Sequence, residues 1–313
     1  MKNEEWKIME EIQLRLNFNI NFTFYIINFT FNLGCCMKIL IVGLGVIGGS
    51  YAMALQAAGY EDVYGIDSNM ETLKKAEGLG IIKKGYVGGK DIIKEADLII
   101  ISLYPRLVKD FIEDNKKLFK EGSIITDATG IKGHFIDDIL DILPNKVDFI
   151  FGHPMAGREK RGIDYASKEV FNGANYLITI TDRNKEDNIK TLEKIIYEMG
   201  FNKIKRINPE YHDKMIAFTS QLPHAIAVAL INSDEEGRDT GSFIGDSYRD
   251  LTRIANINEE LWSELFFSNK DNLIDVIDNF LLEINNLKKA LNENNEEYLK
   301  ELFIKSTKRR EKL

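Results

Sequence analysis

Cysteine is almost missing from this chain of 313 residues, and the little there is lies near one end. Cys35 and Cys36 are adjacent, and no cysteine follows them. This excludes a disulfide scaffold for the rest of the chain and suits the reducing cytoplasm. Lys and Arg, 41 in all, are outnumbered by 49 Asp and Glu, and the net charge of −8 argues against nucleic-acid binding. No uninterrupted apolar run reaches the roughly 18 residues of a membrane-spanning helix, so no membrane contact is expected.

The first 36 residues differ in composition from the rest of the chain. Residues 17–32 use only Asn, Phe, Ile, Thr and Tyr. Acidic residues near the start and the repeated Asn make a signal peptide a poor fit. Met37 then opens a Met-Lys-Ile-Leu-Ile-Val-Gly stretch that is typical of a natural start. We expect residues 1–36 to be an atypical extension, either disordered or produced by a mis-assigned start.

Residues 37–207 alternate between strand and helix patterns. Strands are expected at 38–42, 62–66, 97–102, 123–126, 149–151, 175–181 and 203–207, with helical patterns between them. This alternation predicts an α/β domain with a mainly parallel sheet. After Asn208 the strand patterns stop, and apolar residues at helical spacing continue from Pro209 and again from Asn269 to about Leu302. Residues 208–313 are therefore expected to form an all-helical domain, whose apolar stripes fit either a dimer interface or packing within the chain.

A glycine-rich turn follows the first expected strand. It reads Gly43-Leu44-Gly45-Val46-Ile47-Gly48 and leads directly into a helical pattern. In a dinucleotide-binding turn, the first glycine permits the tight turn, the second lets the backbone approach a pyrophosphate, and the third allows close strand–helix packing. The start of the helix supplies positive potential to the phosphates. The turn predicts a dinucleotide site in a Rossmann-like doubly wound sheet.

Asp67 ends the second expected strand and refines the cofactor prediction. A carboxylate at this place accepts hydrogen bonds from both adenine-ribose hydroxyls and repels a 2′-phosphate, and Ser68 and Asn69 provide no Arg to hold one. NAD is therefore predicted rather than NADP. Ser102, at the end of the strand expected at 97–102, is predicted as a further cofactor contact.

The chain has only four histidines, so each position is informative. His153 follows the strand expected at 149–151, and ligands of open α/β sheets bind at the carboxyl ends of the strands. An imidazole there can take the proton of a substrate hydroxyl as a hydride leaves. The alternative is a loop histidine held by packing against Pro154.

The other histidines carry weaker signals. His224 follows Pro223, which removes a backbone donor and is expected to kink its helix, turning neighbouring side chains into a cavity. A core or solvated histidine is the alternative. His134 is expected at the surface, and His212 in a structural role.

The remaining candidates are basic. Residues 248–253 read Tyr-Arg-Asp-Leu-Thr-Arg, and the guanidinium groups of Arg249 and Arg253 are suited to a substrate carboxylate, although surface salt bridges are an equal alternative. Histidine and cysteine are too few for metal-ligand spacing, so no metal is expected.

Together these motifs resemble the prephenate dehydrogenase family of tyrosine biosynthesis. The matching stretches stand in the family's order and cover residues 37 to about 267. They are Gly43–Ser50, Asp127 with Lys132, His153–Gly157, Ser220 with Leu-Pro-His224, and Asp250–Ala255.

The resemblance implies oxidative decarboxylation of prephenate to 4-hydroxyphenylpyruvate with NAD, in a homodimer formed by the helical domain. It implies that His153 takes the proton of the ring hydroxyl and that Arg253 holds a substrate carboxylate. Arg249 is expected to help, and His224 to line the substrate pocket.

Two positions depart from the family pattern. Many relatives have a Ser near Ala128-Thr129-Gly130, and Thr129 is the candidate for its catalytic hydroxyl. Many also have His where this chain has Gln221, which keeps arogenate open as the alternative substrate. Another hydroxyacid dehydrogenase of this architecture would need a catalytic Lys, and Lys214 lacks the accompanying pattern. A non-enzymatic NAD sensor would need neither His153 nor Arg253.

Overall fold

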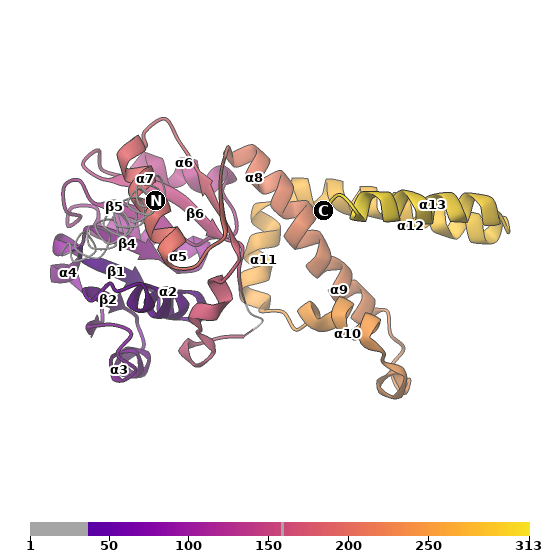
Figure 1. Ribbon diagram of the computed structural model, residues 1–313, viewed down its shortest axis with the longest axis horizontal. Helices are drawn as coiled ribbons and strands as arrows, with labels where there is room; N and C mark the ends of the chain where they lie inside the picture. Colours follow the sequence, from indigo (N-terminus) through magenta and orange to yellow (C-terminus); the bar gives the residue numbers. More distant parts are fainter. Residues whose placement is uncertain (1–36, 158–159) are drawn as a thin grey trace, which may run out of the picture.

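The computed structural model describes residues 37–157 and 160–313. The expectation for residues 1–36 lies outside the described residues. Figure 1 shows a sheet with helices on both of its faces, and an arm of helices that projects from it. This is the α/β domain followed by an all-helical domain that the sequence predicts.

One eight-stranded sheet forms the first domain. Its spatial order is β3-β2-β1-β4-β5-β6-β7-β8, and every neighbouring pair is parallel except β6 with β7, which is antiparallel. The first six strands have the doubly wound order, in which the order of the strands reverses between β1 and β4 and a crevice opens at the carboxyl ends of these two strands. The strands are β1 (Ile39–Val42), β2 (Val63–Ile66), β3 (Lys84–Tyr86), β4 (Leu98–Ile101), β5 (Ile124–Asp127), β6 (Asp148–Pro154), β7 (Asn175–Thr179) and β8 (Lys203–Ile207).

Two apolar cores lie on the opposite faces of this sheet. One core packs α2 (Val46–Ala57), α3 (Met70–Gly78) and α7 (Glu186–Glu198) against the sheet. The other packs α4 (Lys90–Glu95), α5 (Pro105–Asn115) and α6 (Gly133–Ile142). The central strands β1 and β4 are buried along their whole length, as their continuous apolar sequences require.

Two short elements of this domain were not predicted. β3 has three residues, Lys-Gly-Tyr, which are partly exposed and lack the apolar run of the central strands. α4 has six residues and follows two glycines with positive φ. Both owe their structure to pairing and packing with neighbours, because their own sequences favour it weakly.

All the regular secondary structure described in the second domain is helical. Its α-helices are α8 (Pro209–Ile216), α9 (Leu222–Asn232), α10 (Asp246–Thr252), α11 (Glu259–Ser268), α12 (Lys270–Asn292) and α13 (Glu296–Arg310). α12 and α13 run side by side and form the far end of the arm (Figure 1). The helical pattern expected from 269 to about 302 thus breaks into two helices, with Asn294 in the turn at a φ of 50°.

The predicted effect of Pro223 takes the form of a wide helical turn. A π-helical segment, Ala217–Gln221, joins α8 to α9 immediately before the proline. Proline lacks an N–H group, so a regular α-helix would leave the carbonyl one turn earlier without a donor. A π-helical turn is one way in which a helix accommodates such a defect, and π-turns are frequent at functional sites.

This continuous stretch also bears on the expectation of no membrane span. Residues Pro209–Asn232 are long and apolar enough to cross a membrane by length and composition, and they are the single such helix among the described residues. In the fold this stretch packs against α12, and 28% of its most apolar 18-residue segment is buried inside the molecule.

Candidate active site

A cleft of about 1080 Å³ lies between the two domains. The sheet domain contributes the turn before α2, the carboxyl ends of β4, β5 and β6, and residues 160–162. The helical domain contributes the π-turn, the start of α9, residues 253–259 and one face of α11. The cleft therefore lies at the crevice where doubly wound sheets bind their ligands.

The glycine-rich turn forms one wall, and its three glycines have separate reasons to be glycine. Gly43 has a φ of +86°, and a Cβ there would lie 2.6 Å from the carbonyl oxygen of Ser102. A Cβ at Gly48 would lie 1.8 Å from the carbonyl oxygen of Gly43. At Gly45, by contrast, a Cβ would meet nothing within 4 Å. Gly45 therefore keeps space open, whereas the other two permit the turn and the packing of α2.

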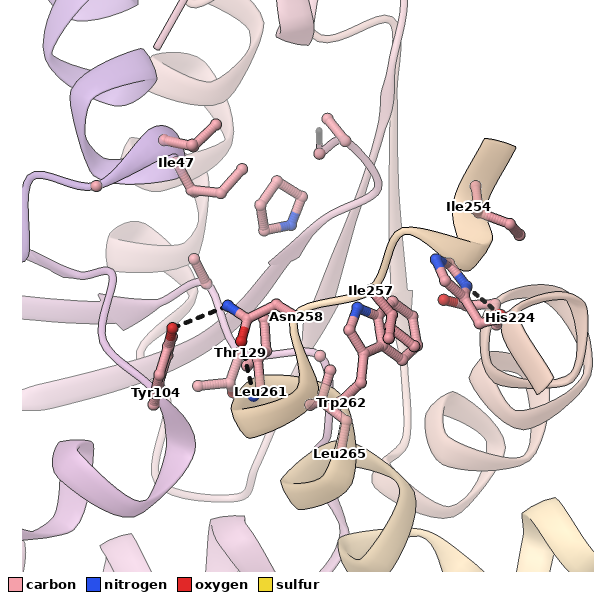
Figure 2. Close-up of a pocket in the computed structure, with 18 of the residues that line it drawn as sticks. Ile47, Tyr104, Thr129, His224, Ile254, Ile257, Asn258, Leu261, Trp262 and Leu265 are labelled. Atoms are coloured by element: carbon pink, nitrogen blue, oxygen red, sulfur yellow. Dashed lines mark hydrogen bonds between the residues drawn. The ribbon is translucent and has the colours of Figure 1, made fainter. Parts of the chain in front are cut away.

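The space beside Gly45 fits a dinucleotide pyrophosphate. Gly45 is the N-cap of α2 and offers no side-chain cap, and the first turn of the helix contains no acidic residue. The amide groups at this helix start are thus available to an anion. Val46 and Ile47 line the cleft next to them, and the Ile47 side chain is seen beside the pocket in Figure 2.

Asp67 and Ser102 complete the predicted cofactor contacts. Asp67 is at the end of β2, where its carboxylate accepts hydrogen bonds from the backbone N–H of Leu44 and of Asn69, both at 2.8 Å. It lies beside the turn rather than in the cleft. Ser102 lines the cleft, and its buried hydroxyl has no hydrogen-bond partner within the described part of the chain. A buried hydroxyl needs a partner, which a bound ligand can supply.

His153 lies near the carboxyl end of β6 and lines the same cleft. Its Nδ1 is 3.0 Å from Nε2 of His212, and Nδ1 of His212 is 2.7 Å from Asp213 Oδ1. Burial, then His212 and the positive charge of Lys132, hold the pKa of His153 well below its ordinary value. The ring is therefore neutral near pH 7 and can accept a proton.

A buried polar cluster supports the loop beside His153. Asp127 Oδ1 accepts the backbone N–H of Gly152 at 3.0 Å, and Oδ2 accepts from Lys132 Nζ at 2.7 Å. The Thr129 hydroxyl donates to the same carboxylate and accepts from Lys132 Nζ at 2.9 Å. Asp127 and Lys132 are fully buried, and burial lowers the pKa of Lys132 against the opposing effect of Asp127. Thr129 lines the cleft with its hydroxyl committed to this cluster.

The helical domain brings His224 to the opposite wall. Its ring stacks on Trp262 of α11, with 3.6 Å between ring centroids. Figure 2 labels both side chains. His224 Nδ1 donates to the carbonyl oxygen of Ser220 at 2.9 Å. Tyr104 of the sheet domain contacts the helical domain, because its hydroxyl accepts a hydrogen bond from Asn258 Nδ2 at 2.9 Å (Figure 2).

The other predicted substrate contacts are placed differently. Arg253 lines the cleft from the turn after α10. Arg249 is not among the residues that line the cleft, and it pairs with Asp246 on its own helix at 3.2 Å. Gln221 lines the cleft, but its amide is engaged on both sides. It donates to the carbonyl oxygen of Leu265 at 2.8 Å and accepts from Asn269 Nδ2 at 2.9 Å.

Several cleft residues were not predicted from the sequence. Trp262, Tyr104 and Asn258 lie outside the motifs, and only the scarcity of tryptophan, with two in the chain, could have pointed to Trp262. His212 was given a structural role, yet it contacts His153 directly. Among the described residues, no group of three His, Cys, Asp or Glu is arranged to hold a metal.

Comparison with known proteins agrees with this geometry. Residues 51–205 match the family model "Prephenate dehydrogenase, nucleotide-binding domain", and residues 208–305 match "Prephenate dehydrogenase, dimerization domain". The prephenate dehydrogenase of Bacillus subtilis is 28% identical over 274 residues, which cover 85% of this chain and 73% of the relative. The cyclohexadienyl dehydrogenase of Zymomonas mobilis is 28% identical over 278 residues, covering 87% of this chain and 94% of the relative.

A solved structure gives the same result. The crystal structure of A. aeolicus prephenate dehydrogenase in complex with hydroxyphenyl propionate and NAD+ superposes with a TM-score of 0.80 at 30% identity. The match covers 88% of this chain and 98% of the other. With the cofactor turn, the histidine at the end of β6 and the helical second domain all in place, the chain belongs to the prephenate dehydrogenase family of NAD-binding oxidoreductases.

Proposed function

We propose that this enzyme oxidatively decarboxylates prephenate to 4-hydroxyphenylpyruvate, with NAD as the hydride acceptor. The observation that carries the proposal is the position of His153. It lines one cleft together with Gly45 of the cofactor turn and Arg253 of the helical domain. A base, a dinucleotide site and a carboxylate partner are the three groups that this reaction requires.

His153 is the base in this proposal. NAD, when bound, would accept the hydride that leaves the ring carbon bearing the hydroxyl group. As the C–H bond breaks, Nε2 of His153 accepts the hydroxyl proton, and the ring becomes a dienone that still carries its carboxylate. Cleavage of the carboxylate bond releases CO₂ and leaves the electron pair in an aromatic phenolate. His153 then returns its proton to the phenolate oxygen, so the reaction neither consumes nor releases a proton overall.

The charge of the cleft favours prephenate over arogenate. Lys160, Arg161 and Arg253 line it, and the carboxylate of Glu259 is paired with Arg161 at 2.7 Å. Prephenate carries two carboxylates and a keto group, whereas arogenate carries an ammonium group in place of the ketone. Cationic walls attract the substrate with the larger negative charge. Arg253 is assigned to a carboxylate because its planar guanidinium can bind both oxygens.

The remaining site residues have supporting roles in this proposal. His224 forms the far wall, held flat against Trp262. Thr129 and Gln221 shape the cleft through their buried hydrogen bonds, and Ser102 contacts the cofactor. Gly43, Leu44, Gly48 and Asp67 set the conformation of the cofactor turn and the ribose side of the site.

We also propose a two-domain division and a homodimer. Residues 37–207 would bind NAD, and residues 208–313 would complete the substrate site and pair two chains in the cytoplasm. The sheet ends at Ile207 and α8 begins at Pro209, which supports the boundary. The match of residues 208–305 to a dimerization domain supports the assembly. The absence of cysteine from residue 37 onward supports the reducing compartment.

One assay tests the activity and the substrate together. NADH formation is followed at 340 nm with prephenate and with arogenate, using NAD and NADP in turn. We expect turnover of prephenate with NAD, and a kcat/KM at least tenfold lower for arogenate or with NADP. No turnover of either substrate would overturn the proposal, and equal kcat/KM values would overturn the charge argument alone.

A further inference from the structure

Asp213, His212 and His153 form a row of hydrogen-bonding groups that crosses from the helical domain to the sheet. Asp213 and His212 belong to α8, and His153 lies near the end of β6. The links are 2.7 Å from Asp213 Oδ1 to His212 Nδ1, and 3.0 Å from His212 Nε2 to His153 Nδ1. His212 is fully buried and Asp213 is 5% exposed, so water does not compete for these bonds.

The direction of each bond in this row is fixed by its first member. A carboxylate only accepts hydrogen bonds, so Nδ1 of His212 must carry the hydrogen. A neutral imidazole carries one hydrogen, which leaves Nε2 of His212 as an acceptor. His153 must then donate from Nδ1, and its Nε2 keeps a lone pair. This is the tautomer that a base needs if Nε2 meets the substrate hydroxyl.

Asp213 is itself held by backbone groups of the sheet domain. Its Oδ1 also accepts the N–H of Lys132 at 2.8 Å, and its Oδ2 accepts the N–H of Gly133 at 2.6 Å. These amides stand at the start of α6, directly after the loop that contains Thr129. Both carboxylate oxygens are therefore occupied, and the carboxylate cannot rotate without losing a bond.

Burial, more than any charged neighbour, lowers the pKa of both rings and keeps them neutral at rest. Burial is the main cause that lowers the pKa of His212, with Lys132 acting in the same direction and Asp213 and Asp127 against it. The pKa of His153 is lowered by burial, His212 and Lys132. Near neutral pH the imidazolium form of His153 is therefore expected only transiently, after the ring has accepted the substrate proton.

We propose that His212 and Asp213 are positioning residues, which fix the tautomer of His153 and hold the imidazolium that forms when it takes the substrate proton. The inference rests on the proposed role of His153 as the base. His212 Nε2 accepts the Nδ1 hydrogen of that imidazolium, and the Asp213 carboxylate orients His212 behind it. In serine hydrolases, a buried carboxylate likewise accepts a hydrogen bond from an imidazole and fixes its tautomer and orientation.

Two substitutions of His212 separate this role from simple packing. In His212→Gln the amide oxygen can still accept from His153 Nδ1, whereas His212→Leu fills the space without an acceptor. We expect kcat with prephenate to fall by about 10²-fold in His212→Leu and by no more than about tenfold in His212→Gln, because general-base effects are of this size. KM for prephenate and for NAD should change little in either variant. Lys214→Gln, an exposed change on the same helix, is the matched control and should behave as wild type.

Equal kcat values for the Gln and Leu variants, or a wild-type kcat in His212→Leu, would overturn the inference. A third variant removes the fixed end of the row: in Asp213→Ala no carboxylate remains to accept from Nδ1 of His212.

Imidazole ¹⁵N spectra of histidine-labelled protein read the tautomers without any turnover, and the chain has only four histidines to assign. We expect His153 to carry its hydrogen on Nδ1 in the wild type and to lose that preference in Asp213→Ala. A hydrogen on Nε2 in the wild type would contradict the inference even in an active enzyme. Failure of the wild type to oxidise prephenate, with the expected tautomer present, would instead reject the proposed function.

Discussion

The Asp127 carboxylate helps β6 to fix the position of His153. It binds the N–H of Gly152, the residue before His153, and it also holds Thr129 and Lys132. Since Asp127 and Lys132 are fully buried, removing either partner would leave an unpaired buried charge, which typically costs about 3–5 kcal/mol. His153, the proposed base, is therefore held through two neighbours: Asp127 binds the backbone N–H of the preceding residue, and His212 contacts its Nδ1.

The pH dependence of the reaction follows from the surroundings of His153. Burial, His212 and Lys132 lower its pKa, so the protonated and inactive form accumulates only in acid. We expect kcat/KM to be constant above about pH 6.5, the ordinary histidine pKa, and to fall only below it. His153→Asn should lower kcat by about 10²–10⁴-fold and remove this acid limb. The measurement is a pH–rate profile of both proteins, and an acid limb at pH 7 or above would contradict the expectation.

Sequence reasoning found the residues whose role follows from a strand end or a motif. His153 was predicted because a histidine after a buried strand must face the crevice. His212 was not, because its contact with His153 joins residues 59 positions apart and exists only once α8 packs beside the end of β6. The same holds for Trp262, which reaches His224 through the packing of α11. Side-chain partners of this kind depend on tertiary structure and leave no local pattern.

At the scale of elements, the start of α2 is where one added side chain is expected to weaken the binding of NAD. A Cβ at Gly45 would enter the space proposed for the pyrophosphate and would meet no protein atom within 4 Å. We expect Gly45→Val to fold normally and to raise KM for NAD at least tenfold, with a smaller effect on KM for prephenate. Gly78→Val is the matched control, since a Cβ there also meets nothing within 4 Å and lies outside the cleft. Steady-state kinetics with each substrate varied would check this, and an unchanged KM for NAD would refute it.

Elements with long apolar runs were predicted well, and short or polar ones were not. β1 and β4 are buried on both faces and show it in sequence, whereas β3 and α4 depend on their neighbours. The division between α12 and α13 was also missed, because the apolar spacing continues past it while the turn is made by asparagines. Asparagine tolerates the left-handed conformation, and that signal is weaker than the apolar period.

For the whole molecule, the outer surface of the helical domain argues for association. Large apolar side chains are exposed there on several helices and turns: Phe243, Leu251, Phe267, Ile274, Leu281, Leu282, Ile284, Leu291, Phe303 and Ile304. Exposed apolar surface of this extent usually marks a protein interface. We expect light scattering to give twice the 35.9 kDa mass of the chain. The double variant Leu281→Glu, Leu282→Glu should give a monomer with an unchanged far-UV spectrum.

The control for this prediction is Lys74→Glu, an exposed position on α3 of the sheet domain. This change alters the net charge by the same two units as the double variant, but away from the helical domain. It should leave the mass at that of a dimer. A monomeric wild type, or a double variant that remains a dimer, would show that the exposed apolar surface has another purpose.

The contacts that join the two domains across the cleft are of unequal kinds. Asp213 meets the start of α6 through buried hydrogen bonds, whereas Arg161–Glu259 and Arg106–Glu264 are exposed ion pairs. Dissolved salt screens exposed charges and hardly reaches buried bonds. We therefore expect rising ionic strength to weaken these exposed ion pairs, while the buried hydrogen bonds between Asp213 and the start of α6 persist.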